Sequence, residues 1–467
     1  MPLQEFDLCV IGAGPGGLSA AIRGSQRGAK VCLVDPGPVG GTCLNRGCIP
    51  ARTFGTTARL MAQLKKAETF GIRIDGSVAV DLEGILTRKE RILRRLRTSL
   101  IVLLNQNKIT WLQGEGILQN AQEVEVRSAD QPAMGIRAKT IILATGSRPA
   151  SIPSCPIDGT TVITSDEILN LKQMPSSLIV IGAGVVGSEF ASYFVDLGAA
   201  VTIVEAAPQL LPAEDPRIAE AFTQSLKRRG VLILTETKVQ AVTQLSSGEA
   251  GVTLSDGRSL KASLVLVATG RAAQLPKGAE GIGLKLQQGR LPVDETLRSE
   301  VPSVFGIGDL LGEYQLACTA SYEGALAAEN ATGEVHARDY SVVPDAIYTE
   351  PEIASVGLTE SEAAESGLEV KVSRLSFTGF ARAQTLEETE GFVQVVADRS
   401  SGRLLGVQII GARATDLIGE AALSIKQKLT LRNLVDTLHG HPTMSESLWE
   451  TAAMALGQSI YYAEHSR

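Results

Sequence analysis

One sequence pattern occurs twice in this chain, and it constrains the fold more than any other feature. An apolar strand at residues 6–11 leads into a glycine loop at 12–17, a helix-like segment and a second apolar strand that ends at Asp35. The same order returns from residue 178 and ends at Glu205. A glycine loop between a strand and a helix is typical of the strand–helix–strand unit of doubly wound α/β proteins. The repeat therefore predicts two Rossmann-like dinucleotide-binding domains.

Both loops have the glycine spacing that lets backbone amides and a helix N-terminus approach a pyrophosphate. In each copy a carboxylate lies 18 residues after the third glycine, where it can accept a hydrogen bond from a ribose. Glu205 would repel a 2′-phosphate, and Ala206 and Ala207 offer no cation, so the second nucleotide is expected to be NAD rather than NADP. The loop glycines are Gly12, Gly14 and Gly17, and then Gly182, Gly184 and Gly187.

Two cysteines, Cys43 and Cys48, follow the first glycine loop closely. In a regular helix five residues rise about 7.5 Å, which exceeds the roughly 4.4–6.8 Å that the Cα atoms of a disulfide span. A bond between these cysteines therefore requires a break in the helix, which Gly47 or Pro50 could supply. The alternative is two unrelated small residues packed in a helix. Their place beside a nucleotide loop favours a two-electron redox pair.

Composition limits the classes of protein that remain. At 467 residues the chain exceeds what one hydrophobic core normally supports, so several domains are expected. The net charge of -7 argues against a nucleic-acid partner, and no run of about 18 apolar residues predicts a membrane span. Six cysteines without a Cys-x-x-Cys pair and four scattered histidines indicate neither a disulfide framework nor a metal site. The first residues lack the features of a signal peptide, so a cytoplasmic location is expected.

The last third of the chain has a different pattern of apolar residues. From about Val343 apolar residues alternate along short strands, and helices are expected from Glu420, Arg432 and Ser445. This pattern predicts an antiparallel sheet backed by helices, that is, an α+β domain. Before it, apolar strands that end in Ala-Thr-Gly close each half of the duplication. We therefore divide the chain into four parts, 1–150, 151–272, 273–341 and 342–467.

A histidine near the end of the chain is a candidate base. His441 precedes a proline, which favours an extended backbone, and Glu446 lies five residues further on. A carboxylate at that spacing can hold one ring nitrogen so that the other faces a substrate. Taken alone, such a residue is more often an ordinary loop histidine, but a redox dithiol needs a base to take its protons. Ser445 is expected to cap the helix that follows.

The cysteine loop, both glycine loops and four further motifs together resemble the pyridine nucleotide–disulfide oxidoreductase family, and within it the dihydrolipoamide dehydrogenase branch. The further motifs are Gly306-Ile-Gly-Asp309, Tyr348-Thr-Glu-Pro-Glu352, Thr389-Glu-Gly-Phe392 and His441-Pro-Thr-Met-Ser-Glu446. The resemblance covers essentially the whole chain. It implies an FAD domain, an NAD domain, a central domain that completes the FAD site and a C-terminal interface domain, matching the four parts above. It also implies a homodimer in which His441 serves the disulfide of the other subunit.

The resemblance implies a role for each matching residue. Cys43 corresponds to the thiol that exchanges with the substrate, Cys48 to the thiol beside the flavin, and His441 with Glu446 to the base and its orienting carboxylate. The positions that match FAD contacts are Gly12, Gly14, Gly17, Asp35, Thr42, Arg52, Gly114, Thr145, Gly146 and Asp309. The positions that match the NAD site are Gly182, Gly184, Gly187, Glu189, Glu205 and Gly270, and among them Glu189 resembles the carboxylate that meets the nicotinamide.

Some positions depart from the family pattern. Arg52 replaces the usual lysine, Cys318 and Thr319 replace the pair in Ala-His-Lys-Ala, and Arg271-Ala-Ala replaces Arg-Pro-Asn. Cys318 is either a third thiol near the site or, as we expect, a small buried residue without a redox role. The cations on the helix expected over 84–107 are interpreted as a solvated face, with a docking face for an acidic carrier as the alternative.

The function expected from these motifs is oxidation of protein-bound dihydrolipoyl groups with FAD and NAD. The carrier and the direction of electron flow in the cell stay open, and the departures favour a carrier outside the usual 2-oxo acid dehydrogenase complexes. A reductase that uses NADPH would need cations after the second strand of the second repeat, and a mercuric reductase would need cysteines near the C-terminus. The sequence has neither. A redox-silent flavoprotein with a structural role is the remaining alternative.

Overall fold

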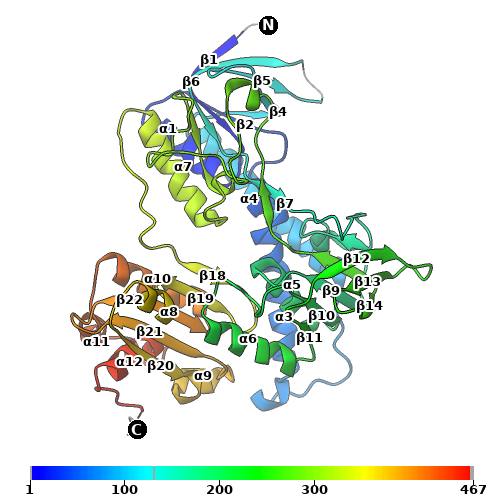
Figure 1. Ribbon diagram of the computed structural model, residues 1–467, viewed down its shortest axis with the longest axis vertical. Helices are drawn as coiled ribbons and strands as arrows, with labels where there is room; N and C mark the ends of the chain where they lie inside the picture. Colours follow the sequence, from blue (N-terminus) through cyan, green and yellow to red (C-terminus); the bar gives the residue numbers. More distant parts are fainter. Residues whose placement is uncertain (1–2, 130–131, 463–467) are drawn as a thin grey trace.

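The first repeat forms the centre of a seven-stranded sheet in the computed structural model, which describes residues 3–129 and 132–462 (Figure 1). The strand order is β3-β2-β1-β6-β5-β4. β17 pairs with β6 on the same side as β5, at residues 141–143. β1, β2, β3, β6 and β17 run parallel, whereas β4 and β5 pair antiparallel. The elements are β1 (Leu3–Ile11), α1 (Pro15–Gln26), β2 (Val31–Asp35), β3 (Thr110–Gln113), β4 (Glu115–Leu118), β5 (Glu123–Arg127), β6 (Met134–Leu143) and β17 (Val304–Gly306).

The second repeat forms a separate five-stranded parallel sheet of order β11-β10-β9-β15-β8. Every residue of β15 is buried, as expected for a strand covered on both faces. A three-stranded antiparallel sheet, β12-β13-β14, is attached to it. The elements are β8 (Val162–Ile163), η2 (Ile168–Asn170), β9 (Ser177–Ile181), α5 (Val185–Asp196), β10 (Ala200–Val204), α6 (Pro216–Arg228), β11 (Leu232–Leu234), β12 (Val239–Gln244), β13 (Ala250–Leu254), β14 (Ser259–Ala262) and β15 (Leu264–Val267).

The chain returns to the first sheet after the second repeat. β7 (Ser147–Pro149) and β16 (Arg271–Ala273), which follow the two Ala-Thr-Gly motifs, pair with each other. α7 (Ala317–Ala331) then packs on α1. This contact is close, because a Cβ added at Gly324 would lie 2.1 Å from the carbonyl oxygen of Gly16. The short helices η3 (Glu280–Ile282) and η4 (Gly308–Leu311) lie in the connecting segment.

The last part of the chain is a five-stranded antiparallel sheet of order β18-β19-β22-β21-β20 with helices against it, as the alternating pattern predicts. The expected helix start at Glu420 is wrong, because α10 begins at Ala414 after Arg413 in the left-handed region, a start without a capping side chain. The elements are β18 (Asp345–Ile347), β19 (Ile353–Gly357), α8 (Glu360–Glu365), β20 (Val370–Ser376), η5 (Phe377–Gly379), α9 (Ala381–Leu386), β21 (Phe392–Asp398), β22 (Leu404–Ile410), α10 (Ala414–Lys426), α11 (Leu431–Asp436) and α12 (Glu446–Ala455).

A helix break lies between the two cysteines. α2 (Gly41–Arg46) ends at Gly47, whose φ of -134° and ψ of -111° are not helical, and α3 (Cys48–Leu64) begins directly afterwards. Gly47 therefore supplies the predicted break. Pro50 does not, because it lies in the first turn of α3, where the missing N–H has no helical partner to lose. η1 (Ala67–Phe70) follows α3.

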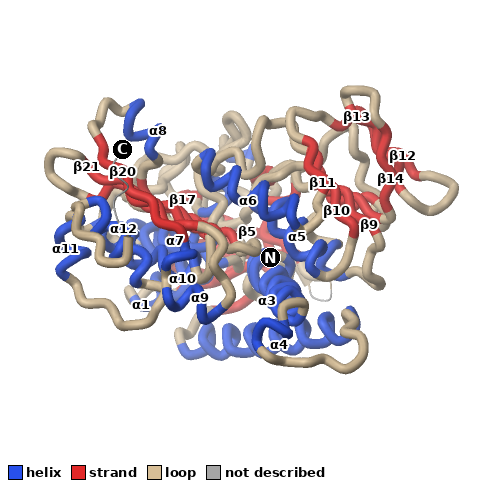
Figure 2. Tube along the Cα trace, turned by 90° about the horizontal axis from the view of Figure 1, so that it is seen from below, coloured by secondary structure: helices blue, strands red, loops and turns tan. Residues whose placement is uncertain are grey.

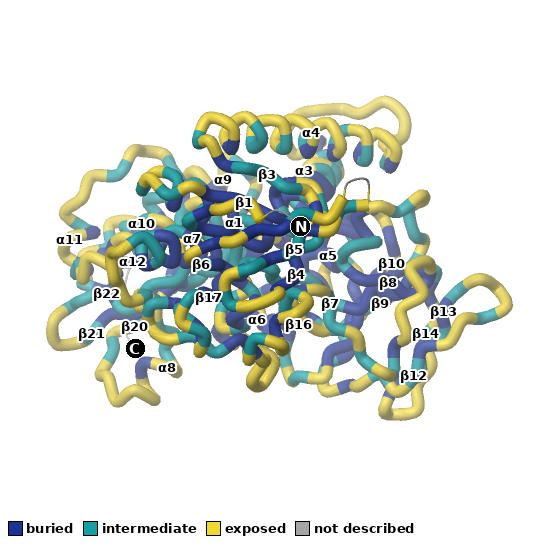
Figure 3. The backbone as a smooth tube through the Cα atoms, turned by 90° about the horizontal axis from the view of Figure 1, so that it is seen from above, coloured by how far each residue is buried: buried dark blue, intermediate teal, exposed yellow. Residues whose placement is uncertain are grey.

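The predicted basic helix is α4 (Leu82–Gln106), which lies alongside α3 with one side exposed along its length (Figures 2 and 3). Lys89 does not belong to the exposed cationic face, because it is 3% exposed and its ammonium donates to the Leu169 carbonyl at 2.9 Å. The exposed cations of its middle turns are Arg91, Arg94 and Arg95. Among the described residues no helix has the length and apolar character that crossing a membrane requires.

Candidate active site

The two glycine loops have the same tight packing. Gly12 and Gly182 have φ of +111° and +94°, and a Cβ on either would lie within 2.1 and 2.6 Å of a carbonyl oxygen. At Gly17 and Gly187 a Cβ would lie 1.7 and 1.9 Å from the carbonyl oxygen of the first loop glycine. Only glycine permits this approach of helix to strand.

The middle glycine of each loop faces open space. A Cβ at Gly14 or Gly184 would meet no atom within 4 Å. The space in front of the first-turn amides of α1 and α5 is therefore free, and the helix dipole favours an anion there. This shape fits a pyrophosphate in both copies.

Asp35 and Glu205 occupy the same place in the two copies. Asp35 accepts a hydrogen bond from the Ala13 amide at 2.7 Å and another, at 2.7 Å, from the amide two residues after itself. Glu205 accepts one from the Ala183 amide at 2.6 Å and another, at 2.7 Å, from the amide two residues after itself. Each carboxylate thereby fixes the glycine loop, and each oxygen keeps a second lone pair that could accept a ribose hydroxyl.

The remaining residues predicted for the nucleotides lie after the carboxyl ends of parallel strands. In the first sheet Gly114 follows β3, Thr145 and Gly146 follow β6, and Asp309 follows β17. In the second sheet Gly270 comes three residues after β15. Parallel strands end at one edge, so each predicted set gathers beside its own glycine loop, where open α/β sheets bind ligands. Thr42 lies in α2, directly before Cys43.

Cys43 and Cys48 lie on the two sides of the helix break, and both are thiols in this structure. The hydrogen bond from Cys43 lowers the pKa of Cys48 to about 7, with a further contribution from the charge of Arg52. The same hydrogen bond, together with burial, raises the pKa of Cys43. As pH rises through about 7, Cys48 is therefore the sulfur that becomes negatively charged, and Cys43 keeps its proton.

Arg52 and Glu189 connect the two repeats at this point. Arg52 lies one helical turn after Cys48 on α3 and forms an ion pair with Glu189 of α5. Glu189 is 6% exposed, and its other oxygen accepts a hydrogen bond from the Tyr348 amide at 2.9 Å. A residue predicted to contact FAD thus meets the residue predicted to contact the nicotinamide.

A cavity of about 240 Å³ adjoins this ion pair, and the sequence analysis missed most of its lining. Arg59 pairs there with Glu352 at 2.7 Å and with Glu388 at 3.0 Å. Burial raises the pKa of Glu350 to about 7. One signal was available in the sequence, since Tyr193 follows Glu189 by one helical turn. The lining residues are Arg52, Gly55, Thr56, Ala58, Arg59, Tyr193, Asp196, Tyr348, Thr349, Glu350 and Glu352.

His441 and Glu446 form the predicted pair, because Nδ1 of the imidazole lies 2.8 Å from Oε1 of the carboxylate. The other carboxylate oxygen accepts the Thr443 amide at 2.8 Å. The prediction that Ser445 caps α12 is wrong, since its hydroxyl bonds to that of Thr443 at 2.8 Å. Within the described residues, the His441 side chain is 61% exposed, and its hydrogen bond to Glu446 stays within its own loop and does not involve the cysteines.

Cys318 is exposed, so the expectation of a buried residue is wrong. It is the second residue of α7, whose inward face presents Thr319, Ala320 and Glu323. Helical periodicity turns Cys318 away from that face. The expectation that Cys318 has no redox role stays a prediction.

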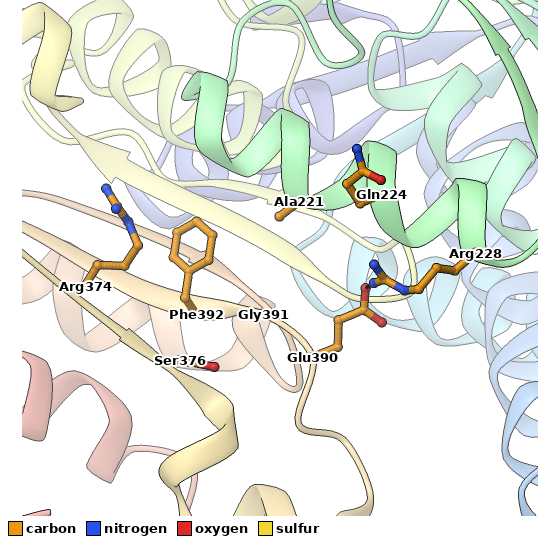
Figure 4. Close-up of a pocket in the computed structure, with 8 residues that line it drawn as sticks. All are labelled: Ala221, Gln224, Arg228, Arg374, Ser376, Glu390, Gly391 and Phe392. Carbon is orange, nitrogen blue, oxygen red and sulfur yellow. Dashed lines mark hydrogen bonds and ion pairs between the residues drawn. The ribbon is translucent and has the colours of Figure 1, made fainter. Parts of the chain in front are cut away.

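Two other features lie apart from the cysteines. A cavity of about 400 Å³ between α6 and β21 is flanked by Arg374 and by the Arg228–Glu390 ion pair (Figure 4). Arg374 donates to Gln394 and lies 5.4 Å from the Phe392 ring centroid.

The second feature is a group of Glu329, Glu334 and His336 with the spacing of cation ligands, but arginines already pair with both carboxylates.

The chain matches known families over nearly its whole length. Residues 6–324 match the model of the pyridine nucleotide-disulphide oxidoreductases, and residues 343–452 match the dimerisation domain of the same proteins. The chain belongs to the pyridine nucleotide–disulfide oxidoreductase family. The predicted family, the α/β fold with two Rossmann-like sheets and a C-terminal antiparallel domain, and the oxidoreductase class are thereby confirmed.

Curated relatives and solved structures agree with this assignment. Dihydrolipoyl dehydrogenase of Chlamydia pneumoniae is 38% identical over 465 residues, which cover 99% of this chain and 100% of the relative. Dihydrolipoyl dehydrogenase of Bacillus subtilis is 36% identical over 98% of this chain and 99% of its own. The crystal structure of LpdA from Mycobacterium tuberculosis superposes with a TM-score of 0.89 at 28% identity, covering 96% of this chain and 99% of that one. The HOCl-induced flavoprotein disulfide reductase RclA of Escherichia coli has a TM-score of 0.86 at 26% identity, with coverage of 96% and 99%.

Proposed function

We propose that this oxidoreductase transfers two electrons from protein-bound dihydrolipoyl groups to NAD through a Cys43–Cys48 disulfide and FAD. The observation that carries the proposal is the cysteine pair across the Gly47 break, with the pKa of Cys48 near 7 beside Arg52. Full-length relatives named dihydrolipoyl dehydrogenase support this choice of substrate.

Both loops leave open space before their helix amides, which fits a dinucleotide in each copy. The family resemblance assigns FAD to the first repeat and NAD to the second. When bound, FAD would accept the electrons of the dithiol and supply hydride to NAD. The Arg52–Glu189 ion pair would join the two cofactor sites, since Arg52 is a predicted FAD contact and Glu189 a predicted NAD contact. The residues that would hold FAD are Gly12, Gly14, Gly17, Asp35, Thr42, Gly114, Thr145, Gly146 and Asp309, and those that would hold NAD are Gly182, Gly184, Gly187, Glu205 and Gly270.

The pKa difference between the cysteines sets the direction of thiol exchange. A dihydrolipoyl thiol loses its proton to His441, and its sulfur attacks Cys43. The Cys43–Cys48 bond breaks, and Cys48 leaves as a thiolate because its pKa is the lower of the two. The second substrate thiol then displaces Cys43, which takes up the proton that this thiol gives up. Substrate leaves as a disulfide, and the enzyme holds both of its electrons as a Cys43 thiol and a Cys48 thiolate.

We propose a homodimer in which His441 of each subunit serves the disulfide of the other. The exposed imidazole, its confinement to its own loop and the match of residues 343–452 to a dimerisation domain support this arrangement. Glu446 accepts the Nδ1 proton and leaves Nε2 free to take the proton of the substrate thiol. In this proposal residues 1–150 bind FAD, 151–272 bind NAD, 273–341 complete the FAD site and 342–467 form the interface, in a cytoplasmic enzyme.

Turnover of free dihydrolipoamide with NAD, followed as NADH absorbance, tests the proposed reaction. We expect NADH to form with dihydrolipoamide as the only reductant. The proposal fails if the purified protein, loaded with FAD, reduces other disulfides but leaves dihydrolipoamide unreacted. If dihydrolipoamide is oxidised, rates with several purified lipoylated carrier proteins would identify the carrier.

The nucleotide preference tests the argument from Glu205. Its carboxylate is 9% exposed and already holds the loop amide, so a 2′-phosphate would bring negative charge against a fixed negative charge. We expect a lower KM for NAD than for NADP. A preference for NADP would contradict this argument while leaving the thiol chemistry untouched.

A further inference from the structure

Two tyrosines enclose the Arg52 guanidinium. Its central carbon lies 3.9 Å from the ring centroid of Tyr348 and 5.9 Å from that of Tyr193. Tyr193 lies on α5, one helical turn after Glu189, and Tyr348 directly follows β18. Three segments that are far apart in the sequence, α3, α5 and the end of β18, therefore meet around one cation.

This enclosure suits an arginine better than the lysine that the family usually has at this position. A guanidinium is planar and weakly hydrated, so it stacks on aromatic rings at little cost. An ammonium is compact and strongly hydrated, and it would lose hydration between the same two rings. Two guanidinium nitrogens of Arg52, Nε and Nη1, are buried without a hydrogen-bond partner among the described residues, which leaves the rings as their neighbours.

The packing of Tyr193 is specific. A Cβ added at Gly55 would lie 2.8 Å from two carbons of the Tyr193 ring, so the glycine on α3 makes room for that ring. Tyr193 is 3% exposed, and its hydroxyl has no hydrogen-bond partner among the described residues. A buried hydroxyl without a partner is costly. The ring, rather than the hydroxyl, is therefore the part of Tyr193 that benefits the site.

We propose that Tyr193 and Tyr348 are positioning residues that hold the Arg52 guanidinium beside Cys48, so that a fixed positive charge stabilises the Cys48 thiolate. The inference rests on the proposed function, in which Cys48 is the thiolate leaving group. Glu189 holds one edge of the guanidinium through the ion pair, and the rings limit its remaining freedom.

Alkylation of Cys48 as a function of pH tests this proposal without requiring turnover. The reduced protein is treated with iodoacetamide over a range of pH, and mass spectrometry measures the labelling rate of Cys48. We expect Tyr193→Leu and Tyr348→Leu each to move the midpoint upward by about half to one pH unit, because the cation is no longer fixed. Tyr193→Phe keeps the ring and should leave the midpoint unchanged. Phe392→Leu removes an arginine–aromatic contact elsewhere and is the matched control.

Two further variants test the fit to a guanidinium. Arg52→Lys should raise the midpoint as much as the leucine variants do, and Gly55→Ala should raise it by displacing the Tyr193 ring. Tyr348 is 43% exposed, so its leucine variant is expected to fold even if the buried Tyr193 variant does not. An unchanged midpoint in Tyr348→Leu, or a lysine variant that keeps the original midpoint, overturns the proposal. Turnover of dihydrolipoamide is measured separately on the unaltered enzyme. If that enzyme shows no turnover, the proposed function is refuted and not the role of the two tyrosines.

Discussion

The cysteine side of the candidate site and its histidine side differ in how the chain holds them. Cys48, Arg52 and Glu189 lie on two packed helices, and a largely buried ion pair fixes the charge beside the sulfur. His441 and Glu446 come from one short stretch of chain, and the imidazole is 61% exposed. The groups that tune a thiol pKa are thus assembled within one chain. The base is presented at the surface, where a second subunit can complete the site.

Loss of the cysteine side should have the largest effect. Cys48→Ser removes the leaving thiolate, so oxidation of dihydrolipoamide should fall by roughly 1,000-fold or more. Cys318→Ser, which alters an exposed thiol, is the matched control and should keep its activity. NADH formation measures both variants. Substantial activity in Cys48→Ser would remove the cysteine side from the mechanism.

The histidine side is best tested by combining two inactive chains. His441→Ala alone should lower dihydrolipoamide oxidation by about 100- to 10,000-fold, while electron transfer from NADH to a quinone is largely kept. Co-expression with Cys48→Ser should restore activity, because each mixed dimer contains one site with an intact disulfide and an intact histidine. Random pairing predicts about one quarter of the unaltered activity. No recovery would show that His441 does not act across the interface.

The pH dependence of labelling compares the two cysteines directly. The pKa of Cys48 lies near 7, below its ordinary value, so its thiolate forms as pH rises through 7 and is lost below it. Cys43 has a raised pKa and should react only at much higher pH. Alkylation of the reduced enzyme, resolved by peptide, should show these two midpoints in this order. Equal midpoints would remove the asymmetry on which the exchange step depends.

The smallest effect is expected at Glu446. Glu446→Gln keeps an oxygen near the imidazole but removes the charge that stabilises its protonated form. Dihydrolipoamide oxidation should fall about 10-fold, less than for His441→Ala. An effect as large as that of His441→Ala would indicate that Glu446 maintains the loop itself.

Local sequence patterns were enough for much of the fold. Each glycine loop, the alternating strands and the break at Gly47 depend on residues that are close in the sequence, so periodicity and turn chemistry reveal them. Burial of Lys89 and exposure of Cys318 depend on which helix face meets another element, and the predictions for both were wrong. A local pattern does not contain that information.

In the candidate site too, features formed by residues close in the sequence were predicted, and features formed by packing of distant segments were not. The cysteine pair, the loop carboxylates and the His441–Glu446 pair are short-range motifs, and the sequence identifies them. The arrangement around Arg52 was missed because Arg52, Glu189 and Tyr348 are each more than 130 residues apart in the sequence and meet only after three segments have packed. The role of His441 toward another subunit came from the family resemblance and not from any local signal.

The central claim, a disulfide between Cys43 and Cys48 that exchanges with a dihydrolipoyl group, is tested most directly by mapping thiols before and after adding dihydrolipoamide. Mass spectrometry of the alkylated protein would report each cysteine. The protein is denatured before alkylation, so that the raised pKa of Cys43 does not limit its labelling. We expect both cysteines to resist alkylation in the oxidised enzyme and to become labelled after dihydrolipoamide is added, while Cys318 is labelled in both states. Labelling of Cys43 and Cys48 to the same extent before and after addition would contradict the claim.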